Sequence, residues 1–183
     1  FDELVAHLDK PEISLIVGPR QAGKTTLLLR LQDFLEKRGD QTLFLNYDLD
    51  TDRPFFANQV SLVERIKLAL GNHGGFVFLD EIQRRTDAGL FLKGLYDMRL
   101  PYKFIVTGSG SLELKEKIHE SLAGRKQLFE LPSLTFREFV NFKTDYAYEN
   151  KEEDFLSIES LRAQAMLSEY LQFRGYPRVV LEQ

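Results

Sequence analysis

The sequence of 183 residues contains no cysteine, which excludes disulfide bonds, thiolate metal sites and a cysteine nucleophile, and which is typical of a reducing compartment. Its three histidines, His7, His73 and His119, are far apart and lack the spacing of metal ligands, so we predict no zinc site. The longest aliphatic runs, such as residues 13–17, are far shorter than the roughly 20 apolar residues of a membrane-spanning helix. We therefore expect a cytoplasmic protein without a membrane segment.

Positive charge is also scarce, because 24 lysines and arginines stand against 28 acidic residues and the net charge is −4. Dedicated nucleic-acid binders are usually basic, so we do not expect constitutive nucleic-acid binding by this chain. A content of 43% hydrophobic and 28% charged residues is ordinary for a folded domain and excludes global disorder. The chain has no initial methionine or signal peptide and stops abruptly at Gln183, so we expect a piece of a longer protein.

Short apolar runs alternate with segments in which apolar residues recur every three or four positions. The runs are expected to be strands, and a fifth strand is expected over residues 127–131. Alternation of strands and helices, with strands apolar throughout rather than at every second residue, predicts an α/β fold with a parallel sheet covered by helices on both faces. The four predicted strands before the fifth are residues 13–17, 42–45, 76–79 and 104–106.

The last third of the chain has a different pattern. Thr135 and Glu138 have the spacing of a capping box, which predicts a helix start there. We expect the core to comprise residues 1–142, and seven charged residues predict a solvated linker over residues 143–154. Residues 155–183 are then expected to begin as a small helical lid and to open a truncated C-terminal region.

Residues 18–25, GPRQAGKT, match the Walker A pattern G-x-x-x-x-G-K-[ST] and lie between a predicted strand and a predicted helix. Backbone N–H groups of such a loop face phosphate oxygens, so a polyphosphate is the expected ligand, and a purely structural glycine-rich turn is the alternative. Lys24 would neutralise the β and γ phosphates and Thr25 would coordinate Mg²⁺. The expected phosphate-binding residues are Gly18, Pro19, Arg20, Gln21, Ala22, Gly23, Lys24, Thr25 and Thr26.

Two acidic residues, Asp80 and Glu81, follow the apolar run of residues 76–79 in the manner of a Walker B strand. At the carboxyl edge of a parallel sheet Asp80 would reach the Mg²⁺ shell, and Glu81 would orient a water molecule for attack on the γ phosphate. Two acids that merely mark a turn after a strand are the alternative. The second acid favours hydrolysis over transfer of phosphate to another substrate.

Two further positions complete the predicted site. Ser109, or as second choice Thr107, ends the run of residues 104–106 and would sense the γ phosphate, unless either makes only a local turn hydrogen bond. Arg125 follows and would add positive charge to the transition state, unless it is an ordinary ion-paired surface residue. The sequence leaves open whether Arg125 acts in its own chain or in a neighbour.

These motifs together resemble the prokaryotic AAA-type ATPases whose ATPase domain precedes a C-terminal domain of unknown function. The resemblance covers nearly the whole chain, through GPRQAGKTTLL, FLDEIQ, IVTGSGSLEL, LAGR, ELPSLTFREF and YLQFRGYP. It implies a RecA-like P-loop core with strand order 5-1-4-3-2, ATP or ADP with Mg²⁺ as ligands, and a helical lid. Tyr176 and Pro177 are similar to a G-x-P element of related signalling ATPases, in which the proline approaches adenine; a plain helix stop is the alternative.

Three functions are weighed from these residues. The leading hypothesis is an ATPase that hydrolyses Mg·ATP to ADP and phosphate and drives a conformational change in an unseen C-terminal domain or partner. The alternative is a nucleotide-dependent switch with negligible turnover, which would use the same binding residues. A DNA translocase needs a basic groove or aromatic platform, and the acidic sequence shows none. A homo-oligomer is compatible with the resemblance, and the effector partner is undetermined.

Overall fold

The computed structural model describes residues 1–109 and 121–173, which divide into two compact units. The first unit comprises Phe1–Arg20 and Lys24–Leu131. The second comprises Pro132–Gln183, with which the three loop residues Gln21–Gly23 are grouped.

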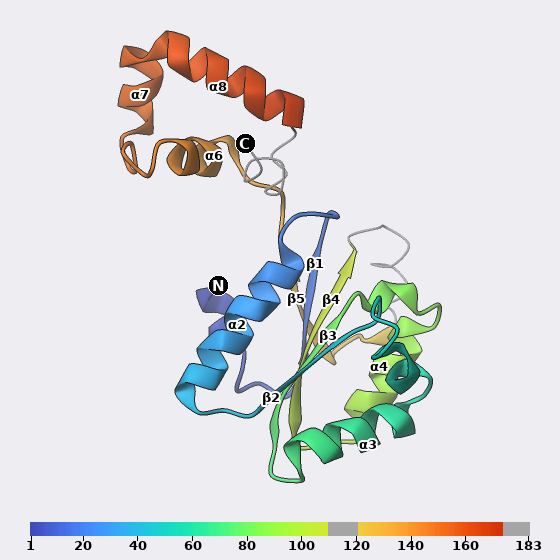
Figure 1. The fold of residues 1–183 in the computed structure, drawn as a ribbon. Helices are drawn as coiled ribbons and strands as arrows, with labels where there is room; N and C mark the ends of the chain where they lie inside the picture. The colour runs from blue at the N-terminus through green and yellow to red at the C-terminus, as the bar shows by residue number, and fades with distance from the viewer. Residues whose placement is uncertain (110–120, 174–183) are drawn as a thin grey trace. The chain divides into compact units, whose positions relative to one another are not determined.

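A parallel five-stranded sheet forms the centre of the first unit (Figure 1). Its order is β2-β3-β4-β1-β5, which confirms the predicted order 5-1-4-3-2 and the α/β fold class. In the register of the sheet, Gly18 at the end of β1 lies beside Ser109, and Asn46 at the end of β2 lies beside Asp80. The ends of these strands therefore meet at one carboxyl edge. The strands are β1 (Ile13–Gly18), β2 (Thr42–Asn46), β3 (Gly75–Asp80), β4 (Tyr102–Ser109) and β5 (Lys126–Glu130).

Helices cover both faces of this sheet. Helix α2 lies on one face, and α3 and α4 lie on the other (Figure 1). In the part of the chain that the structure describes, no helix is long and apolar enough to cross a membrane. The helical elements of the first unit are α1 (Asp2–Ala6), α2 (Lys24–Arg38), the 3₁₀ turn η1 (Arg53–Phe56), α3 (Gln59–Leu70), the 3₁₀ turn η2 (Ile82–Arg84) and α4 (Ala88–Asp97).

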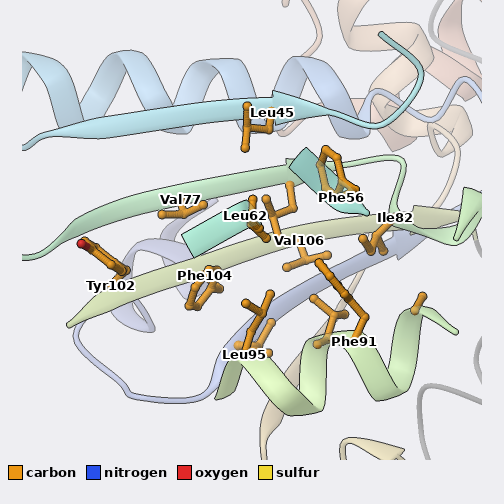
Figure 2. Close-up of a cluster of buried hydrophobic side chains, with 14 of the residues drawn as sticks. Leu45, Phe56, Leu62, Val77, Ile82, Phe91, Leu95, Tyr102, Phe104 and Val106 are labelled. Atoms are coloured by element: carbon orange, nitrogen blue, oxygen red, sulfur yellow. The ribbon is translucent and has the colours of Figure 1, made fainter. Parts of the chain in front are cut away.

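Two apolar clusters explain why the strands are apolar throughout. In β1, Leu15 and Val17 belong to the cluster on the α3 and α4 face, whereas Ile16 belongs to the cluster on the α1 and α2 face. Figure 2 shows the first of these clusters, in which Phe91 of α4 packs with Val106 of β4. A strand buried on both faces needs apolar side chains at odd and even positions alike, so its sequence does not alternate.

The second unit is a small helical assembly with its own apolar cluster, built on Phe139, Val140, Phe155 and Ala163. Its helices are α6 (Phe136–Lys143), α7 (Glu152–Ile158) and α8 (Ser160–Phe173). Thr135 and Glu138 form the predicted capping box at the start of α6.

The boundary between the units lies at Leu131 and Pro132, earlier in the chain than the predicted boundary after residue 142. Helix α6 belongs to the second unit because Phe139 packs against Tyr170 of α8, with ring centroids 5.7 Å apart. The charged residues that predicted a linker are also part of this unit. Lys143 pairs with Glu169 at 2.9 Å, and charge composition alone could not reveal such a partner.

Candidate nucleotide-binding site

The loop after β1 turns sharply at the carboxyl edge of the sheet. Gln21 and Gly23 have φ angles of 63° and 92°, in the region that only glycine adopts at low cost. At Gly18 there is no room for a side chain, because an added Cβ would lie against the carbonyl oxygen of Leu131, just after β5. The predicted glycine-rich loop therefore begins at a position where only glycine fits.

Lys24, the first residue of α2, is buried, and its amine turns back onto the loop. The Nζ donates to the carbonyl oxygens of Gly18 at 3.0 Å and Pro19 at 2.7 Å. Burial lowers the pKa of Lys24; the carboxylates of Glu81 and Asp80 act in the opposite direction, and Arg20 lowers the pKa further. A buried amine with two carbonyl acceptors gains from stronger anionic acceptors, and phosphate oxygens are of that kind.

Asp80 is completely buried at the end of β3 and accepts four hydrogen bonds. Its Oδ2 accepts from Thr25 Oγ1 at 2.8 Å and from Asn46 Nδ2 at 3.3 Å. Its Oδ1 accepts from Thr107 Oγ1 and from the backbone N–H of Glu81 at 3.1 Å. The structure thus brings together Lys24, Thr25, Asp80 and Glu81, which were predicted from two separate motifs.

The oxygen donors of Thr25 and Asp80 fit Mg²⁺, which prefers hard oxygen ligands and usually takes one or two from the protein beside water and phosphate oxygens. Among the described residues, no group of three or more histidine, cysteine, aspartate or glutamate side chains could hold a metal ion. Thr25 and Asp80 are therefore the residues of this site that would hold such an ion.

Glu81 has a left-handed backbone, with φ 59° and ψ 32°. Such a conformation costs a residue other than glycine on the order of 1–3 kcal/mol and persists only where the surroundings impose it. Here its N–H donates to Thr107 Oγ1 at 3.1 Å, and its Oε2 accepts from Gln83 Nε2. The backbone and the carboxylate of Glu81 are both held by neighbouring side chains.

The other predicted residues are placed differently. Thr107, the second choice for a phosphate sensor, is buried against Asp80. Its hydroxyl donates to the Asp80 carboxylate and accepts from the N–H of Glu81. Ser109 lies beside Gly18 at the carboxyl edge, but its side chain is outside the described part of the structure. Tyr176 and Pro177 also lie outside the described residues.

Arg125 lies at the opposite edge of the sheet from Lys24. Its carbonyl oxygen accepts from the N–H of Ile13, the first residue of β1, at 2.9 Å. Five strand residues at about 3.3 Å each separate that position from Gly18, a distance of about 16 Å. Its guanidinium pairs with Asp97 at 2.9 Å. The structure therefore does not bring Arg125 to the nucleotide loop of its own chain.

Two site residues, Asn46 and Gln83, were missed by the sequence analysis. Asn46 ends β2 beside β3, and a polar residue at the end of a buried strand was a usable signal. Gln83 follows Glu81 by two residues, and only the turn of η2 returns its side chain to the carboxylate.

A parallel sheet of this order, with the loop of Gly18 and Lys24 after β1, defines a P-loop domain of the AAA type. The chain belongs to the family described as "AAA domain", whose model matches residues 10–140. This membership confirms the resemblance drawn from the motifs.

Curated relatives carry the match across a large part of this chain. The uncharacterized protein MJ1544 of Methanocaldococcus jannaschii is 28% identical over 170 residues, which are 93% of this chain and 36% of that protein. The uncharacterized protein Rv2008c of Mycobacterium tuberculosis is 36% identical over 139 residues, or 75% of this chain and 29% of that protein. The chain thus spans about a third of the length of these curated relatives.

Solved structures share the fold at low identity. The Aeropyrum pernix ORC1 protein in complex with DNA aligns with a TM-score of 0.52 and 18% identity, over 83% of this chain and 47% of that one. A chain of Drosophila ORC bound to AT-rich DNA and Cdc6 aligns with a TM-score of 0.50 and 14% identity, over 94% of this chain and 79% of that one. At these identities the likeness concerns the fold alone.

Proposed function

We propose that this domain binds Mg·ATP at the loop after β1 and hydrolyses it to ADP and phosphate. The observation that carries the proposal is the 2.8 Å hydrogen bond between Thr25 and Asp80, with Glu81 close enough to Lys24 to act on the pKa of its amine. A hydroxyl and a carboxylate for the ion, an amine for the phosphates and a second carboxylate for water are the parts that phosphoryl transfer to water needs.

Each residue has a defined task in this proposal. Lys24 exchanges the carbonyl oxygens of Gly18 and Pro19 for phosphate oxygens. Thr25 and Asp80 would hold the Mg²⁺, which would neutralise charge on the phosphate oxygens. Glu81 accepts a proton from the attacking water and orients it, a contribution of about 10²–10⁴ in rate for groups of this kind.

Two substitutions test the proposal because they separate binding from chemistry. We expect Lys24→Ala to weaken ATP binding about tenfold or more, since a hydrogen bond to a charged group is lost. We expect Glu81→Gln to keep ATP affinity and to lower turnover at least about a hundredfold. Calorimetric affinity and phosphate release, each with and without Mg²⁺, would be measured.

Matched surface variants serve as controls. Lys37→Ala removes a lysine of the same helix that pairs with Asp33 in solvent, and Glu64→Gln neutralises an exposed acid on α3. Neither should change affinity or turnover. Normal phosphate release by Glu81→Gln would remove Glu81 from its proposed role, and Mg²⁺-independent turnover would contradict the task given to Asp80.

A nucleotide switch with slow turnover is a second candidate, favoured by the position of Arg125. The arginine pairs with Asp97 at the far edge of the sheet, so a lone chain brings no arginine from that motif to its phosphates. In a switch, ATP and ADP bind tightly while phosphate release stays near background at every protein concentration. Turnover that depends on Glu81 would decide for the ATPase.

We also propose that the second unit acts as a lid on bound nucleotide and that nucleotide turnover drives a change elsewhere in a longer protein or in a partner. Support comes from the family resemblance and from the larger size of the relatives, of which this chain spans about a third. A chain ending at Leu131 tests the lid, because it should still fold but bind ATP more weakly. Turnover measured with and without DNA, RNA or candidate proteins tests the coupling.

A further inference from the structure

Gln83 makes a direct contact with the carboxylate proposed to orient the attacking water. Its Nε2 donates to Glu81 Oε2, and among the described residues this is the one hydrogen bond of the Gln83 side chain. No described residue donates to Glu81 Oε1. One carboxylate oxygen is thus tied to the protein while the other is left for a different donor.

The orientation of the Gln83 amide shows what the contact is for. Its Oε1 is buried and has no partner among the described residues. An unpaired buried acceptor is unfavourable, and turning the amide over would place this carbonyl oxygen against a carboxylate, which also only accepts. The amide orientation that allows the hydrogen bond to Glu81 is therefore the one that leaves the carbonyl oxygen of Gln83 unpaired.

The backbone on both sides of Gln83 is held by contacts. The preceding residue, Ile82, is completely buried in the apolar cluster shown in Figure 2. The N–H of Arg84 donates to the carbonyl oxygen of Glu81 at 3.1 Å and closes the turn η2. A side chain on so short and anchored a turn can fix its partner precisely, as the supporting groups of a catalytic residue must.

We propose that Gln83 is a positioning residue, which holds Glu81 Oε2 so that Oε1 faces the attacking water. The proposal rests on the hydrolytic function proposed above. It assigns Gln83 no contact with nucleotide, so its loss should alter the rate of the chemical step and leave binding intact.

The test is Gln83→Met, which keeps the length of the side chain and removes the donor. We expect kcat to fall about ten- to a hundredfold, the range that a lost hydrogen bond to a charged group produces. The Kd for ATP, measured by calorimetry, should stay within about twofold. Gln83→Ala is measured beside it, so that the bulk of methionine is not mistaken for the loss of the donor.

Gln32→Met is the matched control. Gln32 Nε2 also donates to a glutamate, Glu36 Oε1 at 2.9 Å, and to Thr42 Oγ1 at 3.0 Å, but at the start of β2 rather than at the carboxyl edge of the sheet. The same chemical change there should leave both kcat and Kd as in the wild type. Unfolding temperatures of all variants show whether any loss of activity follows a loss of structure.

A double-mutant cycle separates positioning from a general structural role. In single-turnover measurements on a Glu81→Gln background, Gln83→Met should cause no further loss, because the group it positions has gone. Wild-type kcat in Gln83→Met, an ATP affinity that falls in proportion to kcat, or an undiminished further loss on the Glu81→Gln background would each overturn the proposal. A wild-type protein that binds ATP without turning it over would instead overturn the hydrolytic function, and this role with it.

Discussion

The hydroxyl of Thr107 lies between the two acidic residues that follow β3. It donates to Asp80 Oδ1 and accepts from the N–H of Glu81 at 3.1 Å, and the side chain is completely buried. One small group thereby couples the orientation of a proposed metal ligand to the left-handed backbone of a proposed catalytic residue. We therefore infer that the Thr107 hydroxyl serves to orient Asp80 and Glu81 rather than to contact nucleotide.

Thr107→Val should therefore lower both stability and turnover. Valine has the shape of threonine but removes one of the two hydrogen bonds that Asp80 Oδ1 accepts and one of the two acceptors of the Glu81 N–H, which costs about 1–3 kcal/mol of the free energy of unfolding. Thr107→Ser should recover most of the loss. Denaturant unfolding and phosphate release would be measured, with Thr42→Val as control, because the hydroxyl of Thr42 hydrogen-bonds to the exposed Glu36. Equal stability of the two valine variants would contradict this account.

At the scale of elements, β1 and the segment after β5 approach each other at Gly18. The N–H of Leu131 donates to the carbonyl oxygen of Val17 at 2.8 Å, and a Cβ on Gly18 would meet the carbonyl oxygen of Leu131 itself. Backbone atoms cannot swing aside as a side chain can, so relief requires the strands to separate.

Gly18→Ala is expected to cost several kcal/mol of stability or to prevent folding, because one methyl group displaces β5 from β1. Gly94→Ala is the matched control, since the atoms nearest to a Cβ there belong to the flexible side chain of Gln59, which can rotate away. The control should be neutral or slightly stabilising, as alanine is the better helix former. Unfolding curves of both variants decide the point, and an equally stable Gly18→Ala would show that the close approach is not fixed.

A second feature at the scale of elements is a polar network at the amino edge of the sheet. There, Lys103 of β4 is hydrogen-bonded to the chain segment that follows α1. Its Nζ donates to the carbonyl oxygens of Lys10 at 2.8 Å and Glu12 at 2.5 Å, and it lies 3.2 Å from Nδ1 of His7. Burial lowers the pKa of Lys103 from 10.5 to about 8, while Glu12 and Asp9 act in the opposite direction.

This network predicts a stability that rises with pH. Between about pH 8 and 10.5 the unfolded chain keeps the Lys103 proton that the folded chain has lost, so the free energy of unfolding increases across that window, by up to about 3 kcal/mol. Below pH 8 Lys103 is protonated in both the folded and the unfolded chain, so it adds no pH dependence to the free energy of unfolding. Lys103→Met should lack this rise. The free energy of unfolding of both proteins would be measured against pH by chemical denaturation, and parallel curves would contradict the prediction.

The sequence predicted most elements because buried parallel strands are apolar on both faces, and the observed β1 exceeds its predicted run only by Gly18. Lys24 and Asp80 were predictable as neighbours because a P-loop and a carboxyl-edge acid share one edge of the sheet. The contact of Gln83 was not predictable, since it depends on the local turn at Glu81. Arg125 directly precedes a parallel strand, and that position alone indicated the amino edge.

At the scale of the whole molecule, Arg125 can act in catalysis only on the nucleotide of a second chain. That nucleotide would have to lie against the amino edge of the sheet in this chain. We predict that specific activity rises with protein concentration, and that Arg125→Ala lowers it roughly a thousandfold, as arginine fingers do. Mixing Arg125→Ala with Glu81→Gln should restore activity, because each supplies what the other lacks across an interface. Concentration-independent turnover without rescue would assign Arg125 to its ion pair with Asp97 alone.

The strand order also determines when the domain can first hold a ligand during its synthesis. β1 is made first, but its partners in the sheet are β4 and β5, the last strands to leave the ribosome. At about 5–20 residues per second, the 113 residues from Gly18 to Leu131 take roughly 6–23 s. Until β4 is complete at Ser109 the nascent chain carries an apolar strand with two unpaired edges, and one edge stays unpaired until β5 follows. We expect ribosome-bound chains to bind chaperones before Leu131 emerges, and to retain nucleotide only afterwards.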